Sequence, residues 1–480
     1  MKMCRFSLAV VCLACATYGR RVQPSVAQMK QNLEMPASSD PLKSLAMHLL
    51  AFGTGIGTAF VPSVPRQAQR NGNSAHAASQ RFPSFRQHVA EMRAETASPS
   101  KQGAPAEQLQ PCPSVILGDR IPDIRQAQAQ ARSEARRDFP QVVQKTDVLP
   151  ASAGEEAELA WMSAHAQQIR DDMVQNGALV FSGFALMKQP RGFEAFYRAL
   201  GLHTCQDPLY SARRGRPNVD GSEDPATYEA VNDENLKNFF LGMHNELLGV
   251  QAPRAGAFAC FKPAETGGEF IIADGRAVFC DVDSEVLERI YRRSIRYSEF
   301  ELPEFEWLDN LPELLQMPLM TYIKGMAFLT LYPFIFSSWD FDVDLVAYRN
   351  SLDKTFTLSA RTPSLPPVLC HPVTGKPSWF CNVHTCSARL RRAREGLYGP
   401  ESPDADDRLS TDIFYGDDGE FSDDDLKHFE EVTSKNMHYL KMKEGDVVLL
   451  DNYQTMHGRN RFNGTRQHAV AWFGGWDGEE

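Results

Sequence analysis

The sequence predicts a mainly β fold with flanking helices, in the form of a barrel or a jelly roll. Beyond residue 200, short apolar runs alternate with Gly, Pro and Asp, which is typical of many short strands joined by turns. No repeat of fixed period is present, which argues against a solenoid. Of the 480 residues, 42% are hydrophobic and 23% are charged, so a disordered, collagen-like or polytopic membrane chain is excluded.

The predicted domain begins with a helix, a strand and a second helix. Apolar residues recur near helical spacing over 157–176, and Gly177 is placed to end that helix. The next run, 178–184, begins Ala-Leu-Val-Phe and predicts a buried strand. Residues 193–200 are expected to form another short helix.

The remaining elements are mostly short strands. They are predicted at 256–261, 270–273, 445–451 and 467–474. One further helix is expected after Ser422, because Ser is a favoured N-cap and the residues that follow it are acidic.

The charge is distributed unevenly, and residues 1–90 have the composition of a targeting segment. They contain ten Lys or Arg and two acidic residues, a net charge of +8, whereas the other 390 residues carry 40 basic and 59 acidic side chains, a net charge of −19. Lys2 and Arg5 precede an apolar run over 6–16, as in a signal peptide. The Arg- and Ser-rich, acid-poor stretch that follows resembles the bipartite presequences of algal plastids. We therefore expect plastid import, with a secreted or membrane-anchored protein as the alternative.

Three further segments complete the predicted organisation. Residues 91–137 are rich in Gln, Ala, Arg and Pro, which predicts a polar linker with a polar helix, and residues 138–480 are expected to form the folded domain. The acidic, aromatic stretch 299–344 is predicted to be an insertion that acts as a lid or an oligomer contact, with ordinary packing of the scaffold as the alternative. The net charge of −11 argues against nucleic acid as a partner, no membrane contact is expected of the mature domain, and a homo-oligomer stays possible.

His244 and Glu246 form a His-x-Glu motif that can bind a metal ion. In an extended segment, residues i and i+2 point to the same side, so an imidazole and a carboxylate converge. The motif is also expected by chance among 12 His and 61 acidic residues. Indeed, a second copy, His428 with Glu430, lies in a predicted helix, where the two side chains diverge by about 200°. On this motif alone, His244 is either a metal ligand or a hydrogen-bonded core histidine.

A second candidate ligand lies near the C-terminus. Residues 445–459 contain a Gly-Asp turn, an apolar strand and then His457. Two His and one carboxylate form the facial triad of non-heme Fe(II) oxygenases, which leaves positions open for other ligands. Arg466 follows nine residues later. A buried Arg needs an anion, and its planar guanidinium fits a carboxylate with two hydrogen bonds.

Six motifs, in the same order along the chain, resemble the Fe(II)/2-oxoglutarate-dependent oxygenases of the TauD/TfdA type, and most closely the clavaminate-synthase-like branch that includes the syringomycin-biosynthesis hydroxylases. They are GALVFSGF (177–184), HNE (244–246), PAETGGE with ADGR (263–276), HPVTGK with WFCN (371–382), YGDDG (415–419) and GDVVLLDN with HGR and NGTR (445–466). The resemblance covers residues 138–480 and implies a double-stranded β-helix, or jelly-roll, core.

The resemblance also implies the cofactors and the reaction. The ligands of Fe(II) would be His244, Glu246 and His457, and Arg466 would bind the distal carboxylate of 2-oxoglutarate. With O₂, such an enzyme hydroxylates a small polar molecule, for example an amino acid, and releases succinate and CO₂.

The resemblance also suggests residues of the substrate pocket. The candidates for the substrate pocket are Asn382, Trp379 and Arg459. The alternative for Asn382 and Trp379 is a structural role as turn and core residues, and the alternative for Arg459 is a surface or ion-pair arginine. Relatives carry a Thr where this chain has Phe270, and that hydroxyl helps to hold 2-oxoglutarate, whereas a Phe cannot donate a hydrogen bond. Two rival functions therefore stay open: a jelly-roll binding protein whose iron site has decayed, and another metal-dependent enzyme on the same fold. Glu246 argues against a halogenase, in which a small residue replaces the carboxylate.

Overall fold

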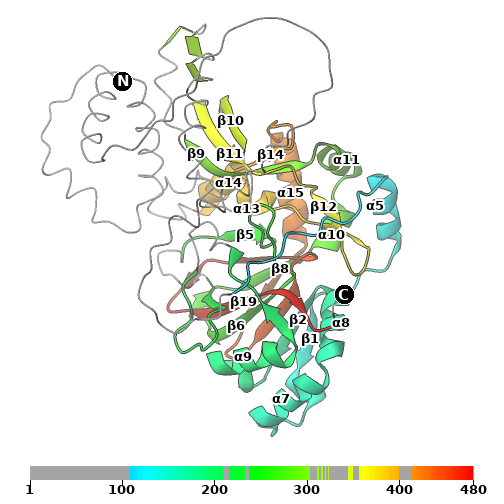
Figure 1. Cartoon of the computed structure of the whole chain (residues 1–480), viewed down its shortest axis with the longest axis vertical. Coiled ribbons are helices and arrows are strands. Elements are labelled where there is room, and N and C mark those ends of the chain that lie inside the picture. Colours follow the sequence, from blue (N-terminus) through cyan, green and yellow to red (C-terminus); the bar gives the residue numbers. More distant parts are fainter. Residues whose placement is uncertain are drawn as a thin grey trace, which may run out of the picture. The chain divides into compact units, whose positions relative to one another are not determined.

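The computed structural model describes residues 109–208, 216–230, 232, 237–302, 311–312, 315–316, 319–320, 323, 344–349, 356–398 and 412–478. The chain divides into two units, and the larger one, residues 109–316 and 338–480, holds every element named below (Figure 1). The predicted presequence, 1–90, and most of the predicted insertion at 299–344 lie outside the described residues.

The larger of two facing sheets contains most of the strands predicted from the sequence. Its order is β1 (Gln141–Gln144), β2 (Ala178–Ser182), β16 (Val447–Asp451), β6 (Ala255–Lys262), β19 (Gln467–Trp476) and β3 (Leu202–Thr204), with β4 (Thr227–Glu229) also paired to β19. Only the pairing of β1 with β2 is parallel within this described sheet.

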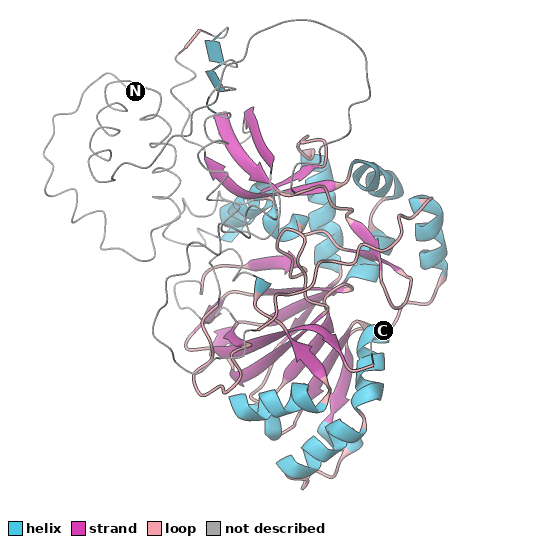
Figure 2. Cartoon of the chain, in the orientation of Figure 1, coloured by secondary structure: helices cyan, strands magenta, loops and turns pink. Residues whose placement is uncertain are grey.

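The smaller facing sheet carries the candidate site. Its order is β15 (Met437–Leu440), β8 (Phe270–Asp274), β17 (Thr455–Arg459) and β5 (Leu241–His244), and all its pairings are antiparallel. Side chains from both sheets meet between them, and the rings of Phe258 and Phe270 lie 4.5 Å apart. The prediction of a jelly roll is confirmed, and Figure 2 shows the strands gathered inside a partial coat of helices.

Strand β16 shows why the central strands are apolar without alternation. Val447 and Leu449 face the helices outside the larger sheet, whereas Val448 and Leu450 face the space between the two sheets. Because both faces of the strand are buried, polar side chains are unfavourable on either face.

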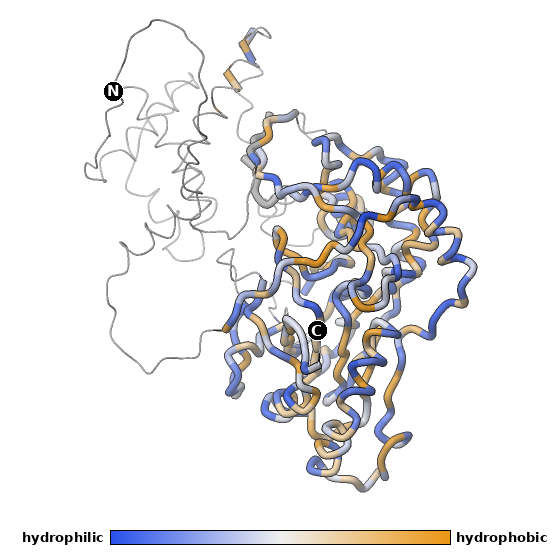
Figure 3. The backbone as a smooth tube through the Cα atoms, turned by 45° about the vertical axis from the view of Figure 1, so that its right-hand side comes forward, coloured by the Kyte–Doolittle hydropathy of each residue, from blue (hydrophilic) through white to orange (hydrophobic). Residues whose placement is uncertain are grey.

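Three helices cover the outer face of the larger sheet: α7 (Glu155–Ala164), α8 (Ala166–Asn176) and α9 (Pro190–Ala199). The sequence predicted one helix over 157–176, but the structure has two, because His165 leaves the helical conformation and its ring stacks on Trp161 at 4.9 Å. Gly177 ends α8 as predicted, with φ +82° and its N–H bonded to the carbonyl of Met173. In Figure 3 the hydropathy alternates along these helices, as expected when one face of each is buried.

The outer face of the smaller sheet is covered by a second layer of helices and short strands. The helices are α5 (Ile124–Ser133), α10 (Gly275–Asp281), α11 (Ser284–Arg293), α13 (Val383–Cys386), α14 (Ala388–Tyr398) and α15 (Asp423–Lys435). The strands are β9 (Ile295–Leu302), β10 (Asp344–Arg349), β11 (Phe356–Arg361) and β14 (Asp412–Tyr415), which form one sheet, and the hairpin of β12 (Val368–Cys370) and β13 (Pro377–Trp379). Ser422 caps α15 as predicted, since its side chain accepts a hydrogen bond from the N–H of Asp425.

The shorter described elements complete the unit. They are α6 (Lys145–Val148), the 3₁₀ helix η1 (Leu186–Lys188) and the pair β7 (Thr266–Gly267) with β18 (Phe462–Asn463).

Residues 109–137, within the segment predicted as a linker, pack on this unit. Ile124 and Gln128 of α5 are buried, and Cys112 forms a disulfide with Cys205 next to β3. The domain boundaries themselves stay a prediction. Among the described helices, none has the length and apolarity needed to cross a bilayer.

Candidate metal and cosubstrate site

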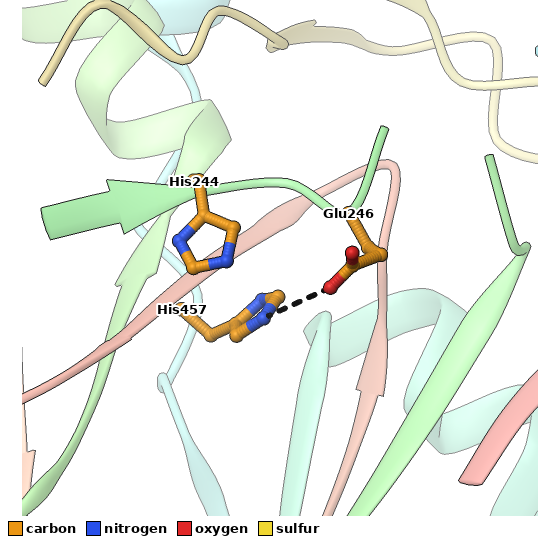
Figure 4. Close-up of side chains that lie close together, drawn as sticks. All are labelled: His244, Glu246 and His457. Carbon is orange, nitrogen blue, oxygen red and sulfur yellow. Dashed lines mark ion pairs between the residues drawn. The ribbon is translucent and has the colours of Figure 1, made fainter. Parts of the chain in front are cut away.

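Strand pairing brings the predicted metal ligands together. His244, the last residue of β5, lies directly opposite His457 of β17 in the antiparallel register, and their ring centroids are 4.3 Å apart. Glu246 follows two residues after His244, and its Oε2 lies 3.9 Å from Nε2 of His457. One ligand atom from each residue lies within 4.8 Å of the others, and Figure 4 shows the three side chains pointing toward one another.

The protonation of the two histidines suits metal binding. Nδ1 of His244 lies 2.8 Å from the carbonyl of Gly242, so this nitrogen carries the proton and Nε2 keeps its lone pair. Burial lowers the pKa of His244, and burial together with the nearby His244 holds the pKa of His457 well below its usual value. Both rings are therefore neutral at pH 7, which is the form that binds a metal.

Two buried asparagines hold the backbone of this motif. The side chain of Asn382 accepts from the N–H of Asn245 at 2.8 Å and donates to its carbonyl at 3.0 Å. Asn452 does the same for Glu246, at 2.8 and 2.9 Å. The segment that carries Glu246 is thus fixed by side-chain hydrogen bonds rather than by a strand ladder.

The donor set fits Fe(II). Two neutral imidazoles and one carboxylate converge, all three side chains are largely buried, and the set leaves part of the coordination sphere to other ligands. His244, Glu246 and His457 would hold the metal.

Arg466 lies where an anion can be bound inside the protein. It is 3% exposed, and its guanidinium donates to the carbonyl of Ala230 at 2.6 Å and to Oδ1 of Asn232 at 3.3 Å. Burial and the neighbouring Arg459 lower the pKa of Arg466 to about 9, so it stays cationic at neutral pH. A buried cation of this kind fits the distal carboxylate of 2-oxoglutarate.

Phe270 forms an apolar wall beside the metal ligands. It is 3% exposed, and its ring lies 6.2 Å from the ring of His457 and nearly parallel to it. Another buried histidine lies on β19. His468 is 3% exposed, and its Nδ1 has no hydrogen-bond partner in the described part of the chain. Burial and the neighbouring Arg466 hold the pKa of His468 well below its usual value, so it is neutral.

The three substrate candidates are placed differently from one another. Trp379 is buried among core residues, packs on Phe429 at 5.4 Å and donates its indole N–H to the carbonyl of Cys381. Asn382 contacts the metal motif through the backbone of Asn245. Arg459 is 2% exposed and lies opposite Phe270 in the strand register. Their contact with a substrate stays a prediction.

Sequence reasoning missed two contributors to the site. In the sequence, Asn452 is only a polar residue that follows an apolar strand, and a polar residue is ordinary at the start of a turn. Arg216 ends the Arg-rich stretch 213–216, which is of a kind ordinarily found in a solvated loop, and its contact with Glu246 joins positions 30 residues apart that no local pattern connects.

Comparison with known proteins gives a family and several distant likenesses. The family profile described as "Taurine catabolism dioxygenase TauD, TfdA family" matches residues 146–472. Dapdiamide synthesis protein DdaC of Enterobacter agglomerans is 23% identical over 316 residues, which cover 63% of this chain and 84% of that protein. Among solved structures, PvcB from Pseudomonas aeruginosa has 14% identity and a TM-score of 0.36, over 64% of this chain and 79% of that one. An asparagine oxygenase in complex with Fe(II), 3-hydroxyasparagine and succinate has 10% identity and a TM-score of 0.38, over 73% and 89%.

Proposed function

The chain belongs to the TauD/TfdA family of Fe(II)- and 2-oxoglutarate-dependent oxygenases, and from this premise we propose that it hydroxylates a small polar molecule of the amino-acid type. The observation that carries the proposal is the convergence of His244, Glu246 and His457 inside the jelly roll. The reaction would consume O₂ and 2-oxoglutarate, convert a substrate C–H group into C–OH, and release succinate and CO₂.

The residues of the chain have separable tasks in this reaction. When bound, Fe(II) and 2-oxoglutarate supply the oxidising chemistry. His244, Glu246 and His457 hold the metal, and Arg466 binds and orients the cosubstrate through its distal carboxylate. The aromatic side chains Phe258, Phe270 and Trp472 lie around His457 and exclude water from that side of the site.

An anaerobic titration tests the proposal without knowledge of the substrate. Fe(II) and then 2-oxoglutarate are added to the full-length, metal-free chain, and the visible charge-transfer band of the chelated pair is recorded. The band should be absent in His244→Ala and weaker in Arg466→Met. His203→Ala removes a histidine that is 60% exposed, and it should leave the band unchanged.

The same titration separates the rival functions. If Fe(II) binds and 2-oxoglutarate produces no band, the chain is another metal-dependent enzyme on this fold. If neither binds, it is a jelly-roll binding protein with a decayed site. If the band forms, substrates are screened by the O₂-dependent release of succinate that each compound stimulates.

We also propose that residues 1–90 direct the chain to a plastid. The support is their net charge of +8, the apolar run at 6–16 and their scarcity of acidic residues. A fusion of residues 1–90 to a fluorescent protein should accumulate in plastids of algal cells. Fluorescence in the medium would instead assign a secretory signal.

A further inference from the structure

Arg216 bridges two buried carboxylates, and one of them belongs to the metal cluster. Its Nη2 donates to Oε2 of Glu246 at 3.0 Å, and its Nη1 donates to Oδ1 of Asp207 at 2.5 Å. The side chain of Asp207 is 0% exposed, that of Glu246 is 5% exposed and that of Arg216 is 16% exposed. The bridge is therefore shielded from water, where charge-assisted hydrogen bonds are strongest.

Two further contacts hold Arg216 in place beside Glu246. The backbone N–H of Arg216 donates to the other oxygen of Asp207 at 2.9 Å, so one carboxylate holds both ends of the arginine. The guanidinium also lies over the indole ring of Trp472, at 5.5 Å from its centroid. Asp207 itself lies two residues after Cys205, whose disulfide to Cys112 links this part of the chain to the segment 109–137.

The geometry gives this contact a task in metal binding. Asn452 fixes the backbone of Glu246, but the carboxylate could still rotate about the bonds of its own side chain. The oxygen that Arg216 holds is the one nearest to His457. Because a carboxylate oxygen has more than one lone pair, it can accept from Arg216 and still face the two histidines.

We propose that Arg216 is a positioning residue that holds the carboxylate of Glu246 toward His244 and His457 and so raises the affinity of the cluster for a divalent metal. The inference rests on the metal-binding role assigned to this cluster in the proposed function. It adds an outer partner to the ligand set, of the kind that tunes metal sites through ligand orientation.

The positive charge of Arg216 by itself would lower the affinity of the cluster for a divalent metal. The direction in which the metal affinity changes when Arg216 is replaced therefore tests the positioning role. A guanidinium beside a ligand repels a divalent cation, so its removal would tighten metal binding if only charge mattered. Asp207 lies 2.5 Å from the same guanidinium and offsets its charge. Orientation therefore dominates, and the loss of Arg216 weakens binding.

The test uses the full-length chain and Co(II) as the probe. The dissociation constant for Co(II) is measured by competition with a chelator, together with the visible absorption bands of the bound ion. Arg216→Met should raise the dissociation constant by about 10- to 100-fold and change the bands, because one ligand is no longer oriented. Arg216→Lys should lie between wild type and Arg216→Met, since a single ammonium cannot bridge both carboxylates in the same geometry.

A matched control separates positioning from general loss of stability. Arg296 is also buried and bridges two carboxylates, Asp344 at 2.6 Å and Asp418 at 3.0 Å, in the sheet that contains β9. Arg296→Met should destabilise the fold and leave the dissociation constant for Co(II) within about twofold of the wild-type value. Asp207→Asn should weaken Co(II) binding less than Arg216→Met, and the double variant should bind no more weakly than Arg216→Met, because both changes act through one contact.

The outcomes distinguish this inference from the function on which it rests. If wild type binds Co(II), and Arg216→Met and Arg216→Lys bind it as tightly or more tightly, the positioning role is overturned while the metal site stands. If Arg216→Met fails to fold, Arg216→Lys and Asp207→Asn decide by the same constants. If wild type binds no Co(II), the proposed function fails, and the inference fails with it.

Discussion

Asn452 determines the position of the Glu246 backbone, and its replacement by Ala is a quantitative test of the site. The side chain is 0% exposed. Its oxygen accepts from the N–H of Glu246 at 2.8 Å, and its nitrogen donates to the carbonyls of Glu246 and Pro253, both at 2.9 Å. Asn452→Ala removes all three hydrogen bonds and leaves three backbone groups without these partners.

The expected loss follows from that count. A buried polar group that loses its partner costs about 1–3 kcal/mol, and water that enters the small cavity recovers part of this cost. Three groups at roughly 1–1.5 kcal/mol each lower the free energy of unfolding by about 3–5 kcal/mol, a large value for one substitution. The freed backbone also displaces Glu246, so metal affinity should fall by about tenfold or more.

Urea unfolding with and without Co(II) measures both effects. Asn382→Ala is the matched comparison, because it removes two hydrogen bonds from Asn245, whose side chain is not a metal ligand. Asn382→Ala should lower the free energy of unfolding by about 2–3 kcal/mol and weaken Co(II) binding less than Asn452→Ala does. At a fixed excess of Co(II), each tenfold loss of affinity reduces the stabilisation by the metal by about 1.4 kcal/mol. A free energy of unfolding within 1 kcal/mol of wild type for Asn452→Ala, or equal losses of Co(II) affinity in the two variants, would refute the reasoning.

Three further predictions concern stability. Burial holds the pKa of His468 well below its usual 6.5, so below that pH the unfolded chain binds a proton that the folded chain excludes. The free energy of unfolding should therefore fall as the pH drops below 6.5, and His468→Gln should make that fall shallower in urea titrations between about pH 5 and 7.5. Cys112→Ser opens the disulfide to Cys205, which spans 93 residues, and should cost about 2–5 kcal/mol; an oxidised wild type no more stable than this variant would contradict it. Phe270→Thr leaves a cavity against Phe258 and should cost about 3 kcal/mol in urea unfolding, so an unchanged free energy would show that Phe270 is not packed there as described.

The elements that were predicted correctly carry a strong local signal. Ser422 caps α15 through a contact three residues away, and Gly177 ends α8 because its φ of +82° suits glycine. The break at His165 carries no such signal. The apolar spacing continues through it, and neither Pro nor Gly marks it, so the local sequence gives no reason to end α7 at His165.

The site was predictable only in part, because its contacts differ greatly in sequence separation. His244 and Glu246 are two residues apart, and a pattern can show them. The partners of the Asn452 side chain are backbone groups of Glu246 and Pro253, 206 and 199 positions away, and backbone groups leave no trace in a sequence. Arg216 is informative only when its two carboxylates are known, and a cluster of arginines in a loop is ordinarily solvated.

The metal cluster depends on the alternation that folds the sheets. On β17, Met456 faces the apolar layer outside the smaller sheet, and His457, the next residue, faces inward opposite His244. A shift of one residue in the pairing would bury His457 in that outer layer and turn Met456 toward the metal site. The register is irregular beside Gly458, where an added Cβ would lie 2.5 Å from the carbonyl of Leu241. The burial of Met456 and the absence of a side chain at Gly458 therefore bring the two histidines together, whereas the long-range contacts of Asn452 and Arg216 orient the carboxylate that completes the set.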